Sequence, residues 1–262
     1  MIRRRDNDRI VISQTAHSWL AGQFALHWGN DNFRIPALAE EVRLAAANHD
    51  NGWFDWEELP LIGPDGRPLD FTEMPIETHL TLWQRGLATL VEQSYYAAFL
   101  VSQHARFLVE SRLRNNPGTE AEAAKLTTFS QNQSQWEAAI LEKLRQVAYY
   151  QEGCQFHILE ANLRLLQIFD WLSLLLCMKE LSESTIVDVP GQSSNHRLEI
   201  RLRPLGSGSF TIDPWPFAME KFELIVQARE LPTAMFEDDQ GFQAAWKSAD
   251  VKSITFVAVQ EG

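Results

Sequence analysis

The sequence Ala-Ala-Ala-Asn-His-Asp-Asn-Gly-Trp at residues 45–53 organises this chain. An apolar helical run ends there in the imidazole of His49 and the carboxylate of Asp50. Gly52 follows at a point where helix C-termini commonly adopt the left-handed conformation. Neutral imidazole and carboxylate are ligands for zinc, iron, manganese and similar ions. The pair therefore indicates a metal-binding position at a helix end, and the alternative interpretation of the pair alone is a solvated helix terminus.

The composition is that of a globular protein with a full-sized core. The chain has 262 residues, of which 45% are hydrophobic. Its net charge of −12 disfavours nucleic acid and anionic membrane surfaces as partners. Cys154 and Cys177 lack the spacing of a thiolate metal site and indicate no disulfide framework. The first residues lack the apolar core of a secretory signal, so we expect a cytoplasmic protein.

Helical periodicity dominates the first two thirds of the chain, and histidines lie on its apolar faces. Residues 10–28 are expected to form a helix in which His17 shares a face with large apolar side chains. After a long loop over residues 54–75, two further helices carry His79 and His104 on their inward faces. Inward histidines need partners, which are either ligands or backbone and water oxygens.

Asp170 lies in the most apolar helix, expected over residues 155–181. No basic residue stands within one turn of it, and burying an isolated carboxylate costs several kcal/mol. Asp170 is therefore protonated, paired with a distant cation, or bound to a metal.

After residue 184 the periodicity changes from helical to alternating. Strands are expected at residues 198–202, 209–212, 222–228 and 253–259, with Gly-rich and Pro-rich turns between them. These segments predict a small antiparallel sheet at the end of the chain.

The four candidate ligands resemble a known signature. His17, then His49-Asp50, then Asp170, each on a separate helix, resemble the H…HD…D pattern of the HD-domain superfamily of metal-dependent phosphohydrolases. The resemblance covers about residues 10–181. The chain also resembles an uncharacterised bacterial branch of HD-like proteins, through Gln14-x-x-His17-x-x-Leu20-Ala21-Gly22, Trp28-Gly29, His49-Asp50-x-Gly52-Trp53 and Asp170-x-x-Ser173-Leu174.

The resemblance implies a mainly α fold, an HD-domain-like helical bundle with a small C-terminal antiparallel β-sheet. It implies an all-helical metal-binding domain at residues 1–184 and a small β appendage at residues 185–262. His17, His49, Asp50 and Asp170 would bind a divalent ion (Mn, Fe, Mg, Co, Ni or Zn), with Asp50 as the bridging or water-orienting carboxylate. By the same resemblance, His79 and His104 would serve a second metal or the substrate.

Three functions follow from these expectations. The first is a metal-dependent hydrolase of a phosphate ester or nucleotide that acts on a small anionic substrate. A homo-oligomeric state is compatible with this function. Many hydrolytic relatives carry Lys where this chain has Trp53, which weakens the case for phosphate. The second function is an HD-like di-iron oxygenase, and the third is a non-catalytic scaffold that binds a ligand or partner.

Overall fold

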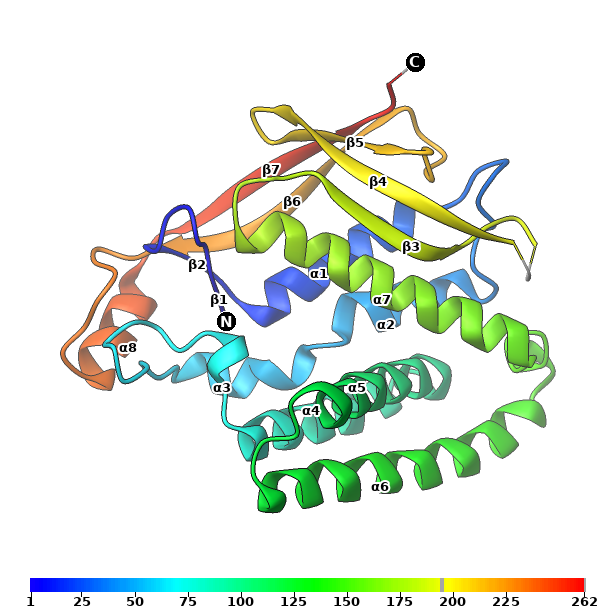
Figure 1. The fold of residues 1–262 in the computed structure, drawn as a ribbon, viewed down its shortest axis with the longest axis horizontal. Helices are drawn as coiled ribbons and strands as arrows, with labels where there is room; N and C mark the ends of the chain where they lie inside the picture. The colour runs from blue at the N-terminus through cyan, green and yellow to red at the C-terminus, as the bar shows by residue number, and fades with distance from the viewer. Residues whose placement is uncertain (194–195, 262) are drawn as a thin grey trace.

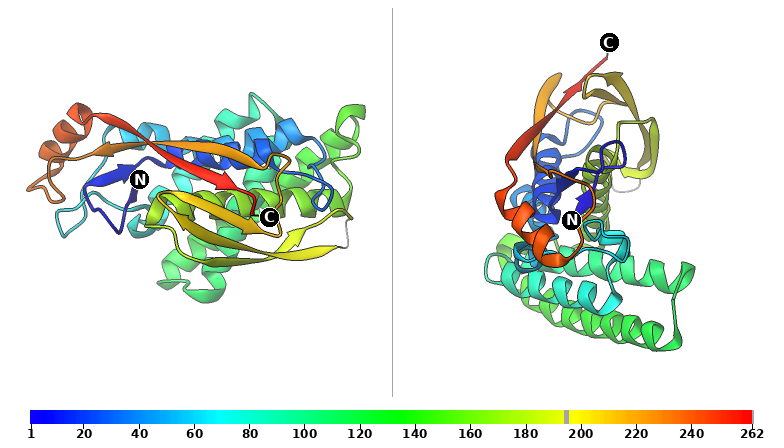
Figure 2. Two further views of the ribbon diagram at one scale, coloured as in Figure 1. Left: turned by 90° about the horizontal axis from the view of Figure 1, so that it is seen from above. Right: turned by 90° about the vertical axis from the view of Figure 1, so that its left-hand side faces the viewer.

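The computed structural model of the protein describes residues 1–193 and 196–261. Its strands are β1 (Ile2–Arg3), β2 (Ile10–Ile12), β3 (Ser184–Pro190), β4 (Arg197–Gly206), β5 (Ser209–Asp213), β6 (Lys221–Glu230) and β7 (Val251–Val259). They form one seven-stranded sheet in the order β1-β2-β6-β7-β5-β4-β3, in which only β5 and β7 pair in parallel. The sheet curls over one side of the molecule as a half-barrel, and the helices fill the other side (Figures 1 and 2).

The predicted fold class is therefore wrong. The chain is neither all-α nor a helical bundle with a small C-terminal antiparallel sheet, because strands from both ends of the sequence form one large mixed sheet. Residues 10–28 were expected to be one helix, but Ile10–Ile12 is a strand that pairs with β1 and β6. Three apolar residues directly before a helix extend its apolar pattern, so their strand character is hidden. The division into domains at residue 184 stays a prediction.

The helices are α1 (Gln14–His27), α2 (Ala39–Asn48), α3 (Phe54–Glu58), α4 (Ile76–Val91), α5 (Tyr95–Asn115), α6 (Glu120–Arg145), α7 (Phe156–Met178) and α8 (Asp239–Ser248). Helices α1 and α7 contact the sheet, whereas α4, α5 and α6 lie farther from it (Figure 1). Thr119 and Glu122 form a capping box at the start of α6. Helix α7 is long and apolar enough to cross a membrane, but 56% of its most apolar window is buried inside the structure, as in a core helix.

Helix side chains cover backbone groups at the edge strand β3 and along β6, which forms a local edge where it extends past its short partner β2. The amide of Gln23 in α1 donates to the carbonyl of Ile225 at 2.8 Å and accepts from its N–H at 2.9 Å. At the opposite edge, Arg164 of α7 donates to the carbonyls of Val187 and Asp188. Such contacts occupy edge groups that could otherwise pair with another strand, and they fix α1 and α7 against the sheet.

Two glycines set how closely the site-bearing segments approach each other. A Cβ atom at Gly22 of α1 would stand 2.6 Å from the Cβ of Ala47 in α2, and one at Gly52 would stand 1.9 Å from the carbonyl oxygen of Leu82 in α4. Gly52 does not adopt a left-handed conformation, so that expectation is wrong. Glycine is required at position 52 instead because the turn after His49 and Asp50 packs directly on α4.

Candidate metal centre

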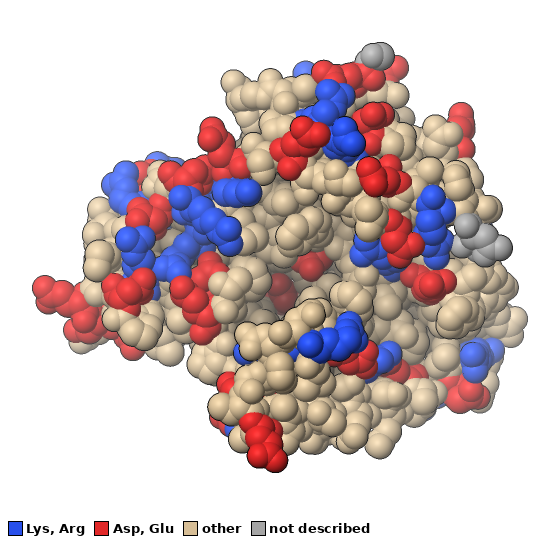
Figure 3. All heavy atoms as spheres, in the orientation of Figure 1, with Lys and Arg blue, Asp and Glu red and all other residues tan. Residues whose placement is uncertain are grey.

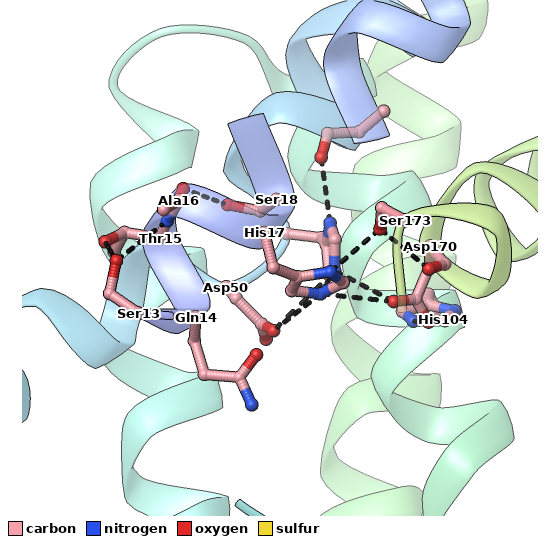
Figure 4. A network of polar contacts seen from close by, with 12 residues as sticks. Ser13, Gln14, Thr15, Ala16, His17, Ser18, Asp50, His104, Asp170 and Ser173 are labelled. Atoms are coloured by element: carbon pink, nitrogen blue, oxygen red, sulfur yellow. Dashed lines mark hydrogen bonds and ion pairs between the residues drawn. The ribbon is translucent and has the colours of Figure 1, made fainter. Parts of the chain in front are cut away.

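Four side chains converge from separate elements in the helical layer (Figure 4). His17 extends from α1, and His49 is the C-terminal cap of α2. Asp50 precedes the 3-10 turn Asn51–Trp53, and Asp170 extends from α7. We call His17, His49, Asp50 and Asp170 the metal-centre cluster. The structure thus brings together the four residues that the sequence pattern selects.

The two imidazole nitrogens of the cluster lie close to each other and to one oxygen of each carboxylate. The Nε2 atoms of His17 and His49 are 3.1 Å apart. Asp170 Oδ1 lies 3.3 Å from each of them, and Asp50 Oδ2 lies 3.5 Å from the first and 3.6 Å from the second. Four ligand atoms bound at about 2.0–2.2 Å by one ion would stand about 3.3–3.6 Å apart in a tetrahedral arrangement. His17, His49 and Asp50 each offer one donor atom within 4.8 Å of the others, which suits one divalent cation, and Asp170 Oδ1 lies beside both imidazole nitrogens.

Hydrogen bonds behind the two imidazoles fix which nitrogen carries the proton. The hydroxyl of Ser173 donates to the carbonyl of Asp170 at 2.8 Å, so it accepts from Nδ1–H of His17, also at 2.8 Å. Nδ1 of His49 lies 2.8 Å from the carbonyl oxygen of Ala46, which can only accept. In the neutral imidazoles both Nε2 lone pairs consequently face the carboxylates, as metal ligands require.

The charges in this cluster balance only with added protons or an added cation. Among the described residues, every ion pair of Asp50 and Asp170 is with a histidine. Burial lowers the pKa of His49, but the nearby carboxylates outweigh burial and raise it to about 9. Burial also opposes ionisation of Asp170, yet hydrogen bonds from His104, His17 and His49 hold its pKa well below the ordinary value. Without another cation, the carboxylates are thus balanced by protons on imidazoles, which a metal would displace.

His104 lies next to the cluster. Its Nε2 is 3.3 Å from Asp170 Oδ2, so Asp170 presents one oxygen to the cluster and the other to His104. The ring is buried, and within the described ranges its Nδ1 has no hydrogen-bond partner. A buried nitrogen without a partner is costly, by about 1–3 kcal/mol.

His79 lies apart from the cluster. Its ring packs against Trp53 and Trp83, with centroid separations of 5.3 and 4.2 Å. No residue that the structure describes forms a hydrogen bond or ion pair with this imidazole, and burial lowers its pKa to about 4. The structure therefore places His104, but not His79, in contact with a proposed ligand. A second metal stays a prediction.

Two further residues belong to the site and were quoted in the sequence pattern without a role. Ser173 follows Asp170 by three residues, so it lies on the same face of α7 and can orient His17. Gln14 precedes His17 by three residues and points towards Asp50 (Figure 4). Helical spacing from a ligand is the signal that could have identified both.

The cluster opens to solvent through its carboxylates. The side chains of Asp50 and Asp170 retain 13% and 14% exposure, whereas the imidazoles of His17 and His49 retain 1% and 3%. Figure 3 shows a hollow near the middle of one face, with acidic atoms in its floor. Basic side chains gather beside the hollow, towards β1 and β2. The carboxylates are therefore the side of the cluster that solvent reaches.

Comparison with known proteins defines the family but no activity. No curated protein and no solved structure matches the chain significantly. Residues 1–233 match DUF3891, which is described as a protein of unknown function. That description makes no link to the HD-domain superfamily, so the resemblance stays a prediction. Because the match covers most of the chain, the protein belongs to the DUF3891 family.

Proposed function

We propose that this protein is a divalent-metal-dependent hydrolase of a phosphate ester or nucleotide. The observation that carries the proposal is the convergence of two Nε2 lone pairs, 3.1 Å apart, with one oxygen of each of two carboxylates at 3.3–3.6 Å from both nitrogens. In the described ranges no Lys or Arg side chain pairs with these carboxylates. This donor set suits Mn, Fe, Co, Ni or Zn, and with added waters Mg.

Asp50 would act as the proton acceptor of the reaction. A divalent ion bound by the cluster would supply positive charge that polarises a phosphoryl oxygen and lowers the pKa of water. The Asp50 side chain is partly exposed and its pKa is held low, because contacts with His49 and His17 outweigh burial. An ionised, accessible carboxylate can take the proton of a water as its oxygen attacks phosphorus. His17 and His49 would hold Asp50 and Asp170 in place.

An anionic substrate is supported by a second cavity on the same helix. A cavity of about 790 Å³ reaches Met178 at the end of α7, and its lining includes Arg3, Arg4, Arg5 and Arg67. The lining also holds Asp6, Asp8, Asp65, Asp70 and Glu73, and ion pairs with four of these acids occupy Arg3, Arg4 and Arg67. Arg5 makes no ion pair with any described residue, so its guanidinium can receive a phosphate. Met178 follows Asp170 by eight residues, which is about 12 Å along a helix. A nucleotide is long enough to span this distance, and arginine would then replace the lysine missing at Trp53.

A di-iron oxygenase is the second candidate, because one observation favours it. His104 approaches the Asp170 oxygen that the metal-centre cluster does not use. A carboxylate shared between two histidine-bearing positions is an arrangement that could hold two ions. Oxygen uptake by the iron-loaded protein would distinguish this function from hydrolysis.

The hydrolase proposal is tested with metal-stripped protein that is reloaded with one metal at a time. We expect Mn²⁺, Fe²⁺ or Co²⁺ to support hydrolysis of at least one member of a panel of phosphate esters and nucleotides. Asp50→Asn should abolish that hydrolysis. The matched control is Glu137→Gln, which changes a buried carboxylate in the interface of α5 and α6 and should leave turnover intact. A fully metal-loaded protein that hydrolyses nothing in the panel would contradict the proposal.

A further inference from the structure

Gln14 is held firmly next to the metal-centre cluster. Its backbone N–H donates to Oε1 of Glu57 at 2.6 Å, and Ser13 caps the helix immediately before it. Because it lies three residues before His17, its side chain is on the same face of α1. The residue is 1% exposed. Gln14 is therefore a fixed part of the site rather than a mobile surface residue.

The side-chain amide oxygen of Gln14 lacks a hydrogen-bond partner among the described residues. Its Oε1 is buried, and no described residue donates to it. Figure 4 shows the amide oxygen turned towards the carboxylate of Asp50. Buried amides in folded proteins are almost always satisfied by protein or by ordered water. The missing partner is consequently a molecule that enters the site.

The chemistry of the two facing groups defines that molecule. An amide oxygen and an ionised carboxylate are both acceptors, so they repel each other unless a donor lies between them. A molecule with two O–H donors satisfies both at once. Water is the smallest such molecule, and a buried polar site with two acceptors is where ordered water is expected.

We infer that Gln14 and Asp50 together hold the water that attacks the substrate, with Gln14 as the water-positioning residue. The inference rests on the proposed hydrolase function. The water donates one hydrogen to each group, which leaves its oxygen lone pairs directed at the substrate. Its oxygen bonds to phosphorus while Asp50 takes the proton, and the bond from phosphorus to the leaving oxygen breaks with its electron pair on that oxygen. Gln14 does not ionise, so the proton goes to Asp50 alone.

High-resolution crystal structures of the Mn²⁺-loaded protein and of Gln14→Met test this directly. We expect a water within about 2.6–3.2 Å of both Gln14 Oε1 and an Asp50 oxygen in the unmodified protein. Gln14→Met has a similar length without the acceptor and should lose the water. Gln14→Glu keeps an acceptor oxygen and should retain it. Mn²⁺ affinity should stay within about threefold in both variants, and kcat of Gln14→Met should fall by about 100-fold with little change in KM.

Gln133→Met is the matched control. Gln133 is also a buried glutamine, but its Oε1 already accepts from Ser102 at 2.9 Å. Its replacement should leave the water, the Mn²⁺ affinity and the turnover unchanged.

Three results would overturn the inference. One is an amide nitrogen of Gln14 that donates directly to Asp50 with no water between them. The second is a water that persists in Gln14→Met, and the third is a loss of Mn²⁺ affinity of more than tenfold in that variant, which would make Gln14 a support for the ligands. Failure of the proposed function is visible separately, in the unmodified protein, as absence of Mn²⁺ binding or as Mn²⁺-loaded protein that hydrolyses nothing in the panel.

Discussion

The helical layer contains two buried polar clusters that differ in how their charges are balanced. The metal-centre cluster places two carboxylates among imidazoles. The second, which we call the α5–α6 network, consists of Ser102, Arg106, Gln133 and Glu137. In that network the Glu137 carboxylate accepts from Ser102 at 2.9 Å and pairs with the guanidinium of Arg106 at 3.1 Å.

The difference indicates which cluster requires something from outside. Arg106 stays charged at every ordinary pH, so the α5–α6 network carries its own cation. In the metal-centre cluster the imidazoles gain charge only by taking up protons, and their Nε2 lone pairs otherwise face carboxylate oxygens. The α5–α6 network is thus complete as a structural element, whereas the metal-centre cluster is complete only with protons or a metal.

The largest expected difference is between Asp170→Asn and Glu137→Gln. Asp170→Asn should abolish metal binding, because one of the two carboxylate ligands is lost. It should also destabilise the metal-free protein at pH 7 by about 3 kcal/mol, because the imidazoles lose the carboxylate that they surround. Glu137→Gln should cost about 1–3 kcal/mol but leave metal binding unchanged. Urea titration measures the stability of both variants, and metal analysis measures their metal content. Equal metal content in the two variants would show that the two clusters do not differ in metal binding.

Serines behind each cluster give the next largest difference. Ser173→Ala removes the acceptor that orients His17 and should weaken metal binding by about 10–100-fold. Ser102→Ala removes a similar buried hydroxyl from the α5–α6 network and should not alter metal affinity. Isothermal titration calorimetry with Mn²⁺ measures both. An unaffected affinity in Ser173→Ala would mean that the tautomer of His17 is set by another contact.

The pH dependence of stability should also separate metal-free from metal-loaded protein. The pKa of His49 is raised to about 9 by its carboxylate neighbours, and that of His17 is raised as well. Protonated imidazoles therefore stabilise the metal-free fold fully below their ordinary pKa of about 6.5, and this stabilisation is lost as pH rises through about 9. The melting temperature of chelator-treated protein should fall between pH 7 and 9.5. In metal-loaded protein the imidazole protons are already displaced, so the melting temperature should not fall over this pH range. Parallel curves of melting temperature against pH for the metal-free and metal-loaded protein would count against the site.

The smallest expected difference in metal affinity is between substitutions of His104, which contacts the cluster, and of His79, which lies apart from it. His104→Ala removes a contact to Asp170 and should reduce metal affinity by about tenfold. His79→Ala should change that affinity by less than about threefold, because the ring contacts Trp53 and Trp83 rather than the ligands. A larger loss of Mn²⁺ affinity in His79→Ala than in His104→Ala would show that the structure places the wrong histidine at the cluster.

The resemblance to the H…HD…D signature, together with helical periodicity, selected the residues that converge. His17 and Asp170 lie on inward faces of their helices, and His49 with Asp50 ends a third helix. Periodicity could not distinguish His79 from His104, however. It indicates that a side chain points inward, but not which neighbouring element it will meet.

The sequence patterns predicted too small a sheet because several strands lack a clear local pattern. Strands β1 and β2 are two and three residues long, too short to display alternation. In β3 the register shifts between Ile186 and Val189, where Asp188 has a positive φ of 59°, so its apolar residues do not alternate regularly. Pairing between β2 and β6 joins residues more than 200 positions apart, which no local pattern reports.

The central claim is that His17, His49, Asp50 and Asp170 bind one divalent ion. The most direct measurement is titration of chelator-stripped protein with Mn²⁺ at pH 7.5, followed by gel filtration and metal analysis. We expect about one tightly held ion per chain in the unmodified protein and in Glu137→Gln, and none in Asp170→Asn. Unmodified protein that retains no ion above trace, or Asp170→Asn that retains as much as the unmodified protein, would contradict this claim.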